Sequence, residues 1–256
     1  IQIQFGYYTE GIFKKYNEFN LTELTPENEN MIRENIEEFT RKYAGEDKGI
    51  SFKEIVIKIV SQDVPNLTLI DLPGLVMVAC TDQGQPENIK EQIRELIQHY
   101  IIQENTIIMG VLPARCDIEV DSALELIKQY DPKGERTIGI LTKIDLMNEN
   151  SDISNYLTND ISNDLKLHYG YFAVKNKNKS ELTYKQNNVL ECEYFNNHPI
   201  YSTLDKSKMG ITNLSIYLSN ILLGQIKKLI PNIQGQLVEK LMVVNKELDK
   251  LGTHIE

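Results

Sequence analysis

The chain has 256 residues, with 27 Lys and Arg against 37 Asp and Glu, and a formal net charge of -10. This length suits one sizeable α/β domain, and 41% apolar residues exclude a disordered chain. The acidic balance argues against nucleic acid as a partner, because binding a phosphate backbone requires an excess of Lys and Arg. Three widely spaced cysteines indicate neither a disulfide framework nor a zinc site, which favours a cytoplasmic protein.

Apolar periodicity and turn residues predict strands that alternate with helices. The chain opens on Ile1 with a strand-like alternation over residues 1–5, so we expect it to begin in mid-fold. In chain order we then expect a helix at 25–43, strands at 54–60 and 67–71, a helix at 86–100, a strand at 106–112, a helix at 120–130, a strand at 137–141, a helix at 153–167 and a strand at 171–174. This pattern predicts an α/β fold, with a mostly parallel sheet covered by helices on both faces.

The C-terminal part is expected to be largely helical. Residues 175–188 are rich in Lys and Asn and predict a loop leading into a helix that ends near Phe195. A long helix should run from about 212 to 230, where Pro231 interrupts it. Beyond the proline, apolar residues from Leu237 to Leu251 recur at heptad spacing. This segment is either an amphipathic helix on its own domain or one helix of a bundle whose partners lie outside the chain.

The first candidate motif, Asp71-Leu72-Pro73-Gly74, follows the apolar run 67–71. In an open parallel sheet, ligands bind beyond the carboxyl ends of the strands. A carboxylate there can hold a magnesium ion through water, and the glycine lets a backbone N–H approach a terminal phosphate. Taken alone, the pattern is better explained as an ordinary turn after a strand.

The second motif, Thr142-Lys143-Ile144-Asp145, follows the predicted strand 137–141. The Asp145 carboxylate can accept two hydrogen bonds from the N1–H and N2–H2 edge of guanine, while the stem of Lys143 covers the base. Bonds to a charged acceptor are worth about 1.5 to 3 kcal/mol each, enough to prefer guanine over adenine. The alternative is that Asp145 caps a following turn.

A third segment, Lys175-Asn176-Lys177-Asn178, follows the predicted strand 171–174 and offers groups that can line the other side of a base. On its own this is an ordinary polar loop. The order is more informative: a phosphate-side motif, a guanine-side motif and a base-lining loop follow one another at predicted strand ends. Together they predict a domain that binds a guanine nucleotide.

The residues 131–147 closely resemble the dynamin family of large GTPases. Further matches in family order are NLTLIDLPG at 66–74, Pro113-Ala114 with Asp117, residues 121–124, Gly170-Tyr171, His198-Pro199 with Tyr201, and Met209-Gly210. The resemblance implies a GTPase-like fold in which residues 1–230 form the GTPase domain and residues 231–256 begin a helical neck, with Pro231 as its hinge.

The resemblance also assigns roles to the motifs. Asp71 and Gly74 would serve the catalytic phosphate side, with Asp71 holding Mg2+ through water. Thr142, Lys143 and Asp145 would bind guanine, and Asn176 and Lys177 would close over the base. Asp117 would reach across a homodimer formed through the GTPase domains; without the resemblance it is a helix-capping or solvated carboxylate. Stalk and membrane contacts are expected only in a longer protein, which would be cytoplasmic and membrane-associated and would hydrolyse GTP to GDP and phosphate.

Several departures from the family pattern qualify these expectations. No Gly-Lys-Ser or Gly-Lys-Thr occurs in the 256 residues, so a phosphate-binding loop is absent from them, and so is the first switch. Val76 and Met77 stand where Thr and Lys are usual, and Asn148 where an acidic residue is common. Residues 177–179 differ from the usual Arg-Ser-Gln. Two hypotheses follow: a part of a dynamin-like GTPase with little activity alone, or a degenerate relative that serves as a scaffold or interaction module.

Overall fold

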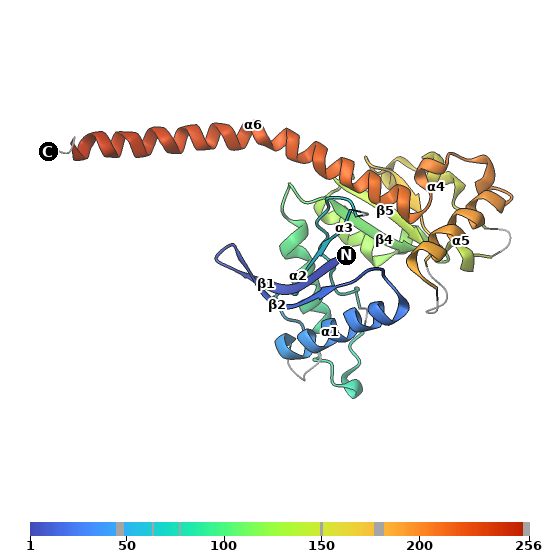
Figure 1. The fold of residues 1–256 in the computed structure, drawn as a ribbon. Helices are drawn as coiled ribbons and strands as arrows, with labels where there is room; N and C mark the ends of the chain where they lie inside the picture. Colours follow the sequence, from blue (N-terminus) through green and yellow to red (C-terminus); the bar gives the residue numbers. More distant parts are fainter. Residues whose placement is uncertain (45–48, 63, 77, 149–150, 177–181, 253–256) are drawn as a thin grey trace.

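The computed structural model describes residues 1–44, 49–62, 64–76, 78–148, 151–176 and 182–252. Its described strands form two sheets of three strands each, with strand orders β2-β1-β3 and β4-β5-β6. The helices surround these sheets, and the last helix extends far beyond them (Figure 1). The parallel sheet therefore holds only three of the six described strands, because the N-terminal strands pair separately.

The N-terminal sheet is antiparallel and is built on a hairpin. Strands β1 (Gln2–Thr9) and β2 (Ile12–Asn20) are joined by Glu10 and Gly11, both at positive φ, as a tight two-residue hairpin turn requires. Strand β3 (Val56–Val60) pairs with the other edge of β1. The strand expected at 1–5 is confirmed and extended, whereas β2 lies where no element was expected.

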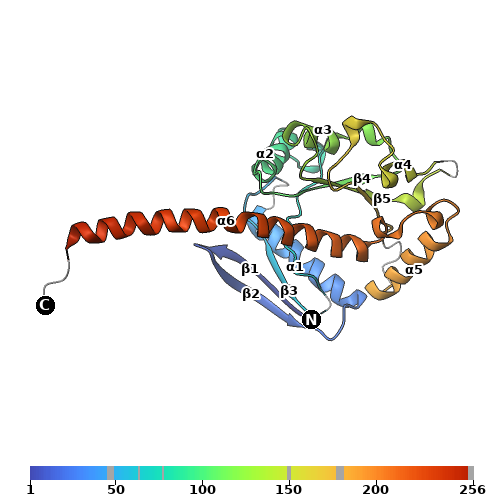
Figure 2. The same ribbon diagram turned by 90° about the horizontal axis from the view of Figure 1, so that it is seen from above.

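Helix α1 (Pro26–Ala44) covers one face of the antiparallel sheet, as Figure 2 shows from above. The hydroxyl of Thr25 accepts a hydrogen bond from the Asn28 N–H at 3.4 Å, so the expected N-cap is in place. Phe39 of this helix packs against Ile3 and Phe5, and these three side chains form the buried centre of the layer. The helix expected at 25–43 is confirmed.

The second sheet is parallel and holds the main core. Its strands are β4 (Ile108–Pro113), β5 (Thr137–Thr142) and β6 (Tyr171–Ala173), with β5 in the middle and every residue of β5 buried. A continuous apolar run is typical of a strand covered on both faces. At Gly139 a side chain would collide with the Tyr171 ring, so the two strands approach closely there.

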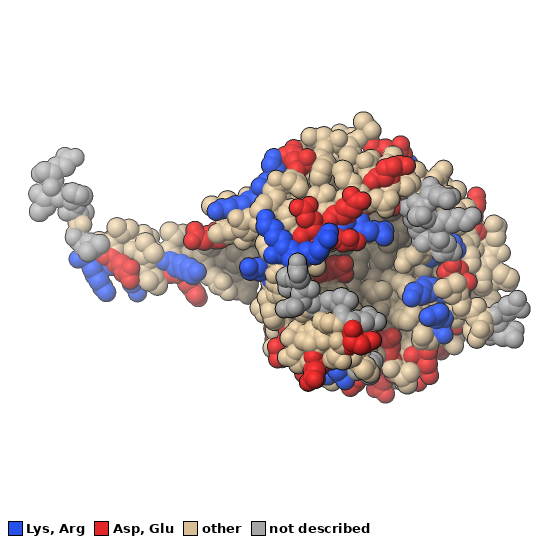
Figure 3. All heavy atoms as spheres, turned by 90° about the horizontal axis from the view of Figure 1, so that it is seen from below, with Lys and Arg blue, Asp and Glu red and all other residues tan. Residues whose placement is uncertain are grey.

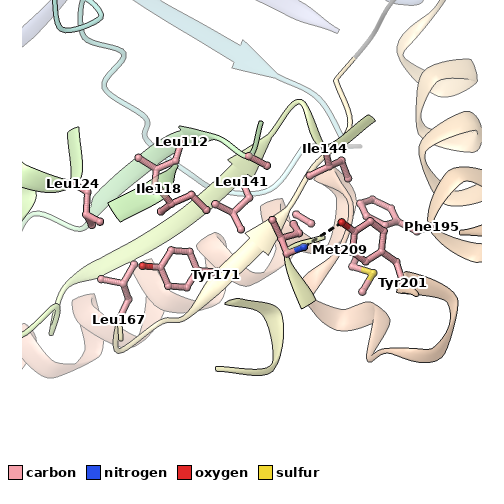
Figure 4. Close-up of a cluster of buried hydrophobic side chains, with 13 residues drawn as sticks. Leu112, Ile118, Leu124, Leu141, Ile144, Leu167, Tyr171, Phe195, Tyr201 and Met209 are labelled. Atoms are coloured by element: carbon pink, nitrogen blue, oxygen red, sulfur yellow. Dashed lines mark hydrogen bonds between the residues drawn. The ribbon is translucent and has the colours of Figure 1, made fainter. Parts of the chain in front are cut away.

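Helices lie on both faces of the parallel sheet. On one face, Ile138, Ile140 and Phe172 pack against Leu214 and Leu218 of the last helix. On the other, residues of all three strands pack against helical and loop side chains, and Figure 4 shows this cluster. The helices are α2 (Ile89–Ile101), α3 (Ser122–Tyr130), α4 (Ser154–Thr158), α5 (Tyr184–Asn197) and α6 (Ile211–Leu251). The expectation of a parallel sheet with helices on both faces is confirmed for β4 to β6.

Three expected elements that precede the last helix differ in the structure. Residues 67–71 form no strand, because a strand needs a partner ladder and no described strand pairs with them. The helix expected at 153–167 ends at Thr158, since Asn159 adopts a left-handed conformation and caps it. The loop expected at 175–188 is shorter, because Thr183 and Gln186 form a capping box that starts α5 at Tyr184.

Helix α6 does not stop at Pro231. The proline lies inside a single helix of 41 residues that curves but runs on (Figure 1). Proline removes one i to i−4 hydrogen bond, and a helix can absorb that loss by bending. Beyond Pro231 the apolar side chains at heptad spacing are exposed in the described part, among them Leu237, Leu241 and Leu248. The expected interruption is therefore wrong.

Candidate functional site

The second motif lies in a sharp turn at the carboxyl end of β5. The buried hydroxyl of Thr142 donates a hydrogen bond to the Leu112 carbonyl of β4 at 3.3 Å, so this side chain joins the two strands. Lys143, which is exposed, adopts a left-handed conformation with φ 57° and ψ 31°. For a residue other than glycine such a conformation costs about 1 to 3 kcal/mol and is found at functional sites. At this turn the chain leaves the sheet, and the Lys143 side chain is exposed.

Asp145 lies in the single 3-10 turn Ile144–Leu146 that follows. Ile144 is buried in the main core, and its carbonyl accepts a hydrogen bond from the Tyr194 hydroxyl of α5 at 3.4 Å. Burial raises the pKa of Tyr194 to about 12, with further contributions from Tyr201 and the Asp145 carboxylate. Asp145 is therefore a half-buried acidic group on a turn that is held from two sides.

The third segment follows β6 and begins beside α5, the helix that also contacts the turn after β5. The backbone N–H of Lys175 donates to the Glu191 carboxylate of α5 at 2.7 Å, and the Lys175 ammonium lies 5.7 Å from the Tyr194 ring centroid. Asn176 is exposed, and Lys177 lies outside the described residues. Helix α5 thus contacts both the turn after β5 and the loop after β6.

An open cleft of about 450 Å³ lies beside Lys175 and the C-terminal part of α5. Lys175, Tyr194 and His198 are among the residues that line it. Burial lowers the pKa of His198, so the ring is mainly neutral near pH 7, and it stacks on Tyr201 with centroids 4.1 Å apart. The lining thus combines the Tyr194 and His198 rings with one lysine and one glutamate, Glu193.

The first motif is placed differently. Asp71 and Gly74 are exposed and belong to an extended segment outside any described strand. The segment is tied at both ends: the Asn66 carbonyl accepts a hydrogen bond from the Ser219 hydroxyl of α6, and Leu75 packs beside α2 and α3. A side chain at Gly74 would meet open space, so nothing in this arrangement requires a glycine there.

Asp117 caps a short turn. Its carboxylate accepts a hydrogen bond from the Glu119 N–H at 3.2 Å, which is the ordinary role expected of it without the resemblance. The side chain also lines a cleft of about 290 Å³ between the loop after β4 and the segment that follows Asp145, with Asn148 and Tyr156 on the other side. The exposed Asp117 therefore lies near the guanine-side turn but points into an open cleft.

The described residues contain no group of three or more His, Cys, Asp and Glu side chains that would hold a metal ion. Mg2+ commonly uses only one or two carboxylates, completed by water and substrate phosphates. The exposed carboxylate of Asp71 fits that pattern when a nucleotide supplies the remaining oxygens. No helix among the described residues combines the length and apolarity of a membrane crossing.

Two buried acidic groups were missed by the sequence analysis. Asp131 accepts hydrogen bonds from the Thr137 hydroxyl and from the N–H groups of Glu135 and Arg136, and so fixes the entry to β5. Glu191 lies on the same helical face as Phe195 and is only 2% exposed. Its spacing of four from a core aromatic residue is the signal that would have placed it inside.

Comparison with known proteins identifies the chain. The family model described as "Dynamin family" matches residues 1–144, which is more than half of the chain, and the model described as "Dynamin central region" matches residues 152–256. The chain belongs to the dynamin family. The resemblance found in the motifs is thereby confirmed, and the two dynamin-family matches divide the chain between the turn after β5 and α4.

Several dynamin-family proteins are similar to this chain. Dynamin-A of Dictyostelium discoideum is 38% identical over 225 residues, which is 86% of this chain and 26% of that protein. Dynamin-3 of Rattus norvegicus is 36% identical over 85% of this chain and 25% of its own length. Dynamin-related protein 3A of Arabidopsis thaliana is 35% identical over 86% of the chain and 27% of its own length. The chain thus spans about a quarter of each of these relatives.

Proposed function

We propose that this chain binds the guanine side of GTP in a dynamin-like protein that hydrolyses GTP and acts mechanically in membrane remodelling. The observation that carries the proposal is the turn after β5, in which a fully buried strand presents Lys143 in a strained conformation and Asp145 on a fixed turn. Family membership supports the same role for these residues.

The base would be held by groups from two loops. Asp145 accepts the two N–H donors of guanine, and the stem of Lys143 covers one face of the ring. Asn176 and Lys177 would close over the base from the segment after β6. Thr142 belongs to the same proposed guanine-binding set, and its bond to Leu112 fixes where the turn begins.

The phosphate side of the site would involve Asp71 and Gly74. Asp71 would hold Mg2+ through water, and the ion supplies charge neutralisation of the phosphates when it is bound with GTP. The Gly74 backbone N–H would then approach the terminal phosphate. Hydrolysis also requires that a water molecule be positioned against the γ-phosphate. We expect little turnover from the 256 residues alone, because they contain no phosphate-loop lysine.

The proposed partners follow from the same assignment. A homodimer through the GTPase domains would place Asp117 near the partner's site, and the exposed position of Asp117 at a cleft supports this proposal. Stalk and membrane contacts would lie in other parts of a longer, cytoplasmic protein. We propose residues 1–230 as the nucleotide-binding unit and 231–256 as the beginning of its neck, although the helix itself is continuous across that boundary.

A second candidate function is a non-hydrolysing scaffold. The observation that favours it is the sequence after Gly74, where Val76 and Met77 replace residues usual in the family. Val76 is half-buried, and Met77 lies outside the described residues. A scaffold of this kind would bind guanine nucleotide weakly or not at all, so nucleotide affinity separates the two functions.

The substitution Asp145→Asn tests the guanine assignment in the full-length protein that carries this chain. An amide offers both donor and acceptor groups, so we expect GTP affinity to fall at least about tenfold while xanthosine triphosphate affinity rises. Titration with fluorescent nucleotide analogues measures both. Asp160→Asn, at an exposed position after α4, is the matched control. If Asp145→Asn leaves GTP affinity unchanged, Asp145 does not bind the base and its role is to cap the turn.

A further inference from the structure

Glu191 connects two parts of the molecule that are far apart in the sequence. It lies near the middle of α5, is 2% exposed, and uses both carboxylate oxygens. Oε1 accepts from the Lys175 N–H at 2.7 Å, in the loop after β6. Oε2 accepts from the Ile211 N–H at 2.8 Å, in the first turn of α6. One buried side chain therefore holds the proposed base-lining loop and the start of the long helix together.

The start of α6 is built closely around this carboxylate. Gly210 has φ 85°, and a side chain there would lie 3.3 Å from Oε2 of Glu191. Its N–H donates to the Ala173 carbonyl at the end of β6, and Met209 pairs with Ala173 in an isolated parallel bridge. Figure 4 shows Met209 beside Tyr201 and Phe195 in the same core cluster. The seat of α6 and the end of β6 thus form one packed junction.

Only a carboxylate accepts both hydrogen bonds at this junction. Both hydrogen bonds come from backbone donors, so each oxygen must act as an acceptor. Burial raises the pKa of the Glu191 carboxyl, while the two backbone bonds and the Lys175 ammonium act to lower it. A glutamine of the same shape would turn its NH2 group toward one of the two donors and leave that N–H buried without an acceptor.

The same helix also supports the guanine-side turn. Three residues after Glu191, the Tyr194 hydroxyl donates to the Ile144 carbonyl next to Asp145. Residues three apart lie on one helix face, so α5 contacts both proposed base-binding loops from a single side. A displacement of α5 relative to α6 would therefore reach the nucleotide through both loops.

We propose that Glu191 is a positioning residue for guanine-nucleotide binding, which holds the base-lining loop against the first turn of α6 so that nucleotide affinity depends on how α6 is seated. This inference rests on the proposed function, since it presumes that guanine binds between the turn after β5 and the loop after β6. Glu191 acts through the Lys175 backbone and does not itself touch the base.

Two substitutions interrupt the bridge from opposite ends. Glu191→Gln removes one acceptor while keeping the size of the side chain. Ile211→Pro removes the N–H donor at the first helical position and puts a ring CH2 in its place, which also displaces the Glu191 carboxylate. The helix itself tolerates proline there, because this N–H has no partner within the helix. Ile211→Ala is its matched control, because it shortens the same side chain but keeps the N–H. Glu125→Gln, exposed on α3, controls for loss of one acidic charge.

Each variant is compared with the unaltered full-length protein by stopped-flow binding of fluorescent GDP and by hydrogen exchange, well below its melting temperature. We expect Glu191→Gln and Ile211→Pro to raise the GDP dissociation rate about tenfold, with the association rate unchanged. Both controls should bind GDP as the unaltered protein does. In the unaltered protein, GDP should also slow amide exchange at 211–214, and this protection should disappear in Glu191→Gln.

The readouts separate positioning from a merely structural role. A destabilised fold would reduce the fraction of protein able to bind, which lowers the amplitude and the apparent association rate rather than raising dissociation. If GDP binds to the unaltered protein but Ile211→Pro and Ile211→Ala dissociate equally fast, the inference is overturned while the proposed function stands. If the unaltered protein binds no GDP, both are overturned.

Discussion

The buried hydroxyl of Thr137 donates a 2.6 Å hydrogen bond to the carboxylate of Asp131. This bond joins the residue that caps α3 to the first residue of β5, the strand that ends at the guanine-side turn. Arg136, between them, donates to the carbonyls of Ile101, Gln103, Thr106 and Tyr130. The position of β5 is therefore fixed at its entry by side-chain hydrogen bonds, to another side chain and to main-chain carbonyls, and not only by packing.

We expect Asp131→Asn to destabilise the fold. The carboxylate accepts three hydrogen bonds. The NH2 group of an asparagine would face at least one of these three donors, so that hydrogen bond would be lost. The free energy of unfolding should fall by about 2 to 3 kcal/mol, as measured by urea denaturation. Asp164→Asn, at an exposed position, serves as the control and should change stability by less than about 0.5 kcal/mol.

The same carboxylate should make stability depend on acid pH. Burial alone would raise the pKa of Asp131, but hydrogen bonds from Thr137, Arg136 and Glu135 and the charge of Arg136 hold it below its ordinary value. Its stabilising contribution is thus present above the unfolded-state pKa and is lost as the pH falls through the lower folded-state pKa. The stability gap between the unaltered protein and Asp131→Asn should narrow between about pH 5 and pH 2. A constant gap across that range would contradict this assignment.

Lys143→Gly should separate folding from binding. Glycine adopts the left-handed conformation without the steric cost that lysine carries, so the free energy of unfolding should not fall and should rise by up to about 1 kcal/mol. Without the lysine stem over the base, GDP affinity should drop about tenfold. Asn159→Gly relieves the same conformation outside the site and should leave GDP affinity unchanged. Equal effects of the two substitutions on GDP affinity would argue against Lys143 as a base contact.

Gly139→Ala should disturb the centre of the parallel sheet. The new methyl group would collide with the Tyr171 ring on the neighbouring strand, which costs about 1 to 3 kcal/mol even after relaxation. Gly224→Ala provides a contrast, because a side chain there meets open space on α6 and should stabilise the helix by about 0.5 to 1 kcal/mol. Thermal unfolding followed by circular dichroism measures both changes. A stable Gly139→Ala protein would show that the two strands can separate at low cost.

The sequence predicted most of the parallel sheet because its strands are continuous apolar runs with clear ends. β5 and the Thr142–Asp145 turn could be located in this way without any knowledge of neighbours. Strand β2 was missed because it shows mixed burial, with exposed residues such as Lys14 and Lys15, so no alternation marks it. Its signal was the Glu10-Gly11 turn, which a two-residue hairpin needs.

Other features depend on contacts that a sequence pattern does not contain. Residues 67–71 have the composition of a strand, but pairing decides whether such a run forms one. Glu191 reads as a solvent-facing residue of a polar helix until the two N–H groups that meet it are known. Pro231 has an intrinsic preference to end a helix, yet the turns on both sides of it continue. In each case the tertiary or longer-range structure outweighs the local preference.

The continuity of α6 has a mechanical consequence. A helix rises about 1.5 Å per residue, so its 41 residues form a rod of about 60 Å. Its first part is docked, because Leu214 and Leu218 pack on the parallel sheet and the Gln225 side chain donates to the Tyr169 hydroxyl. The part beyond Gln225 is an arm of about 40 Å, and tilting it by one degree moves its far end by about 0.7 Å. Because the helix runs unbroken past Pro231, a small rotation of the docked part is delivered as a larger sweep at Leu251. The junction at Glu191 thus lies at the docked end of a lever arm.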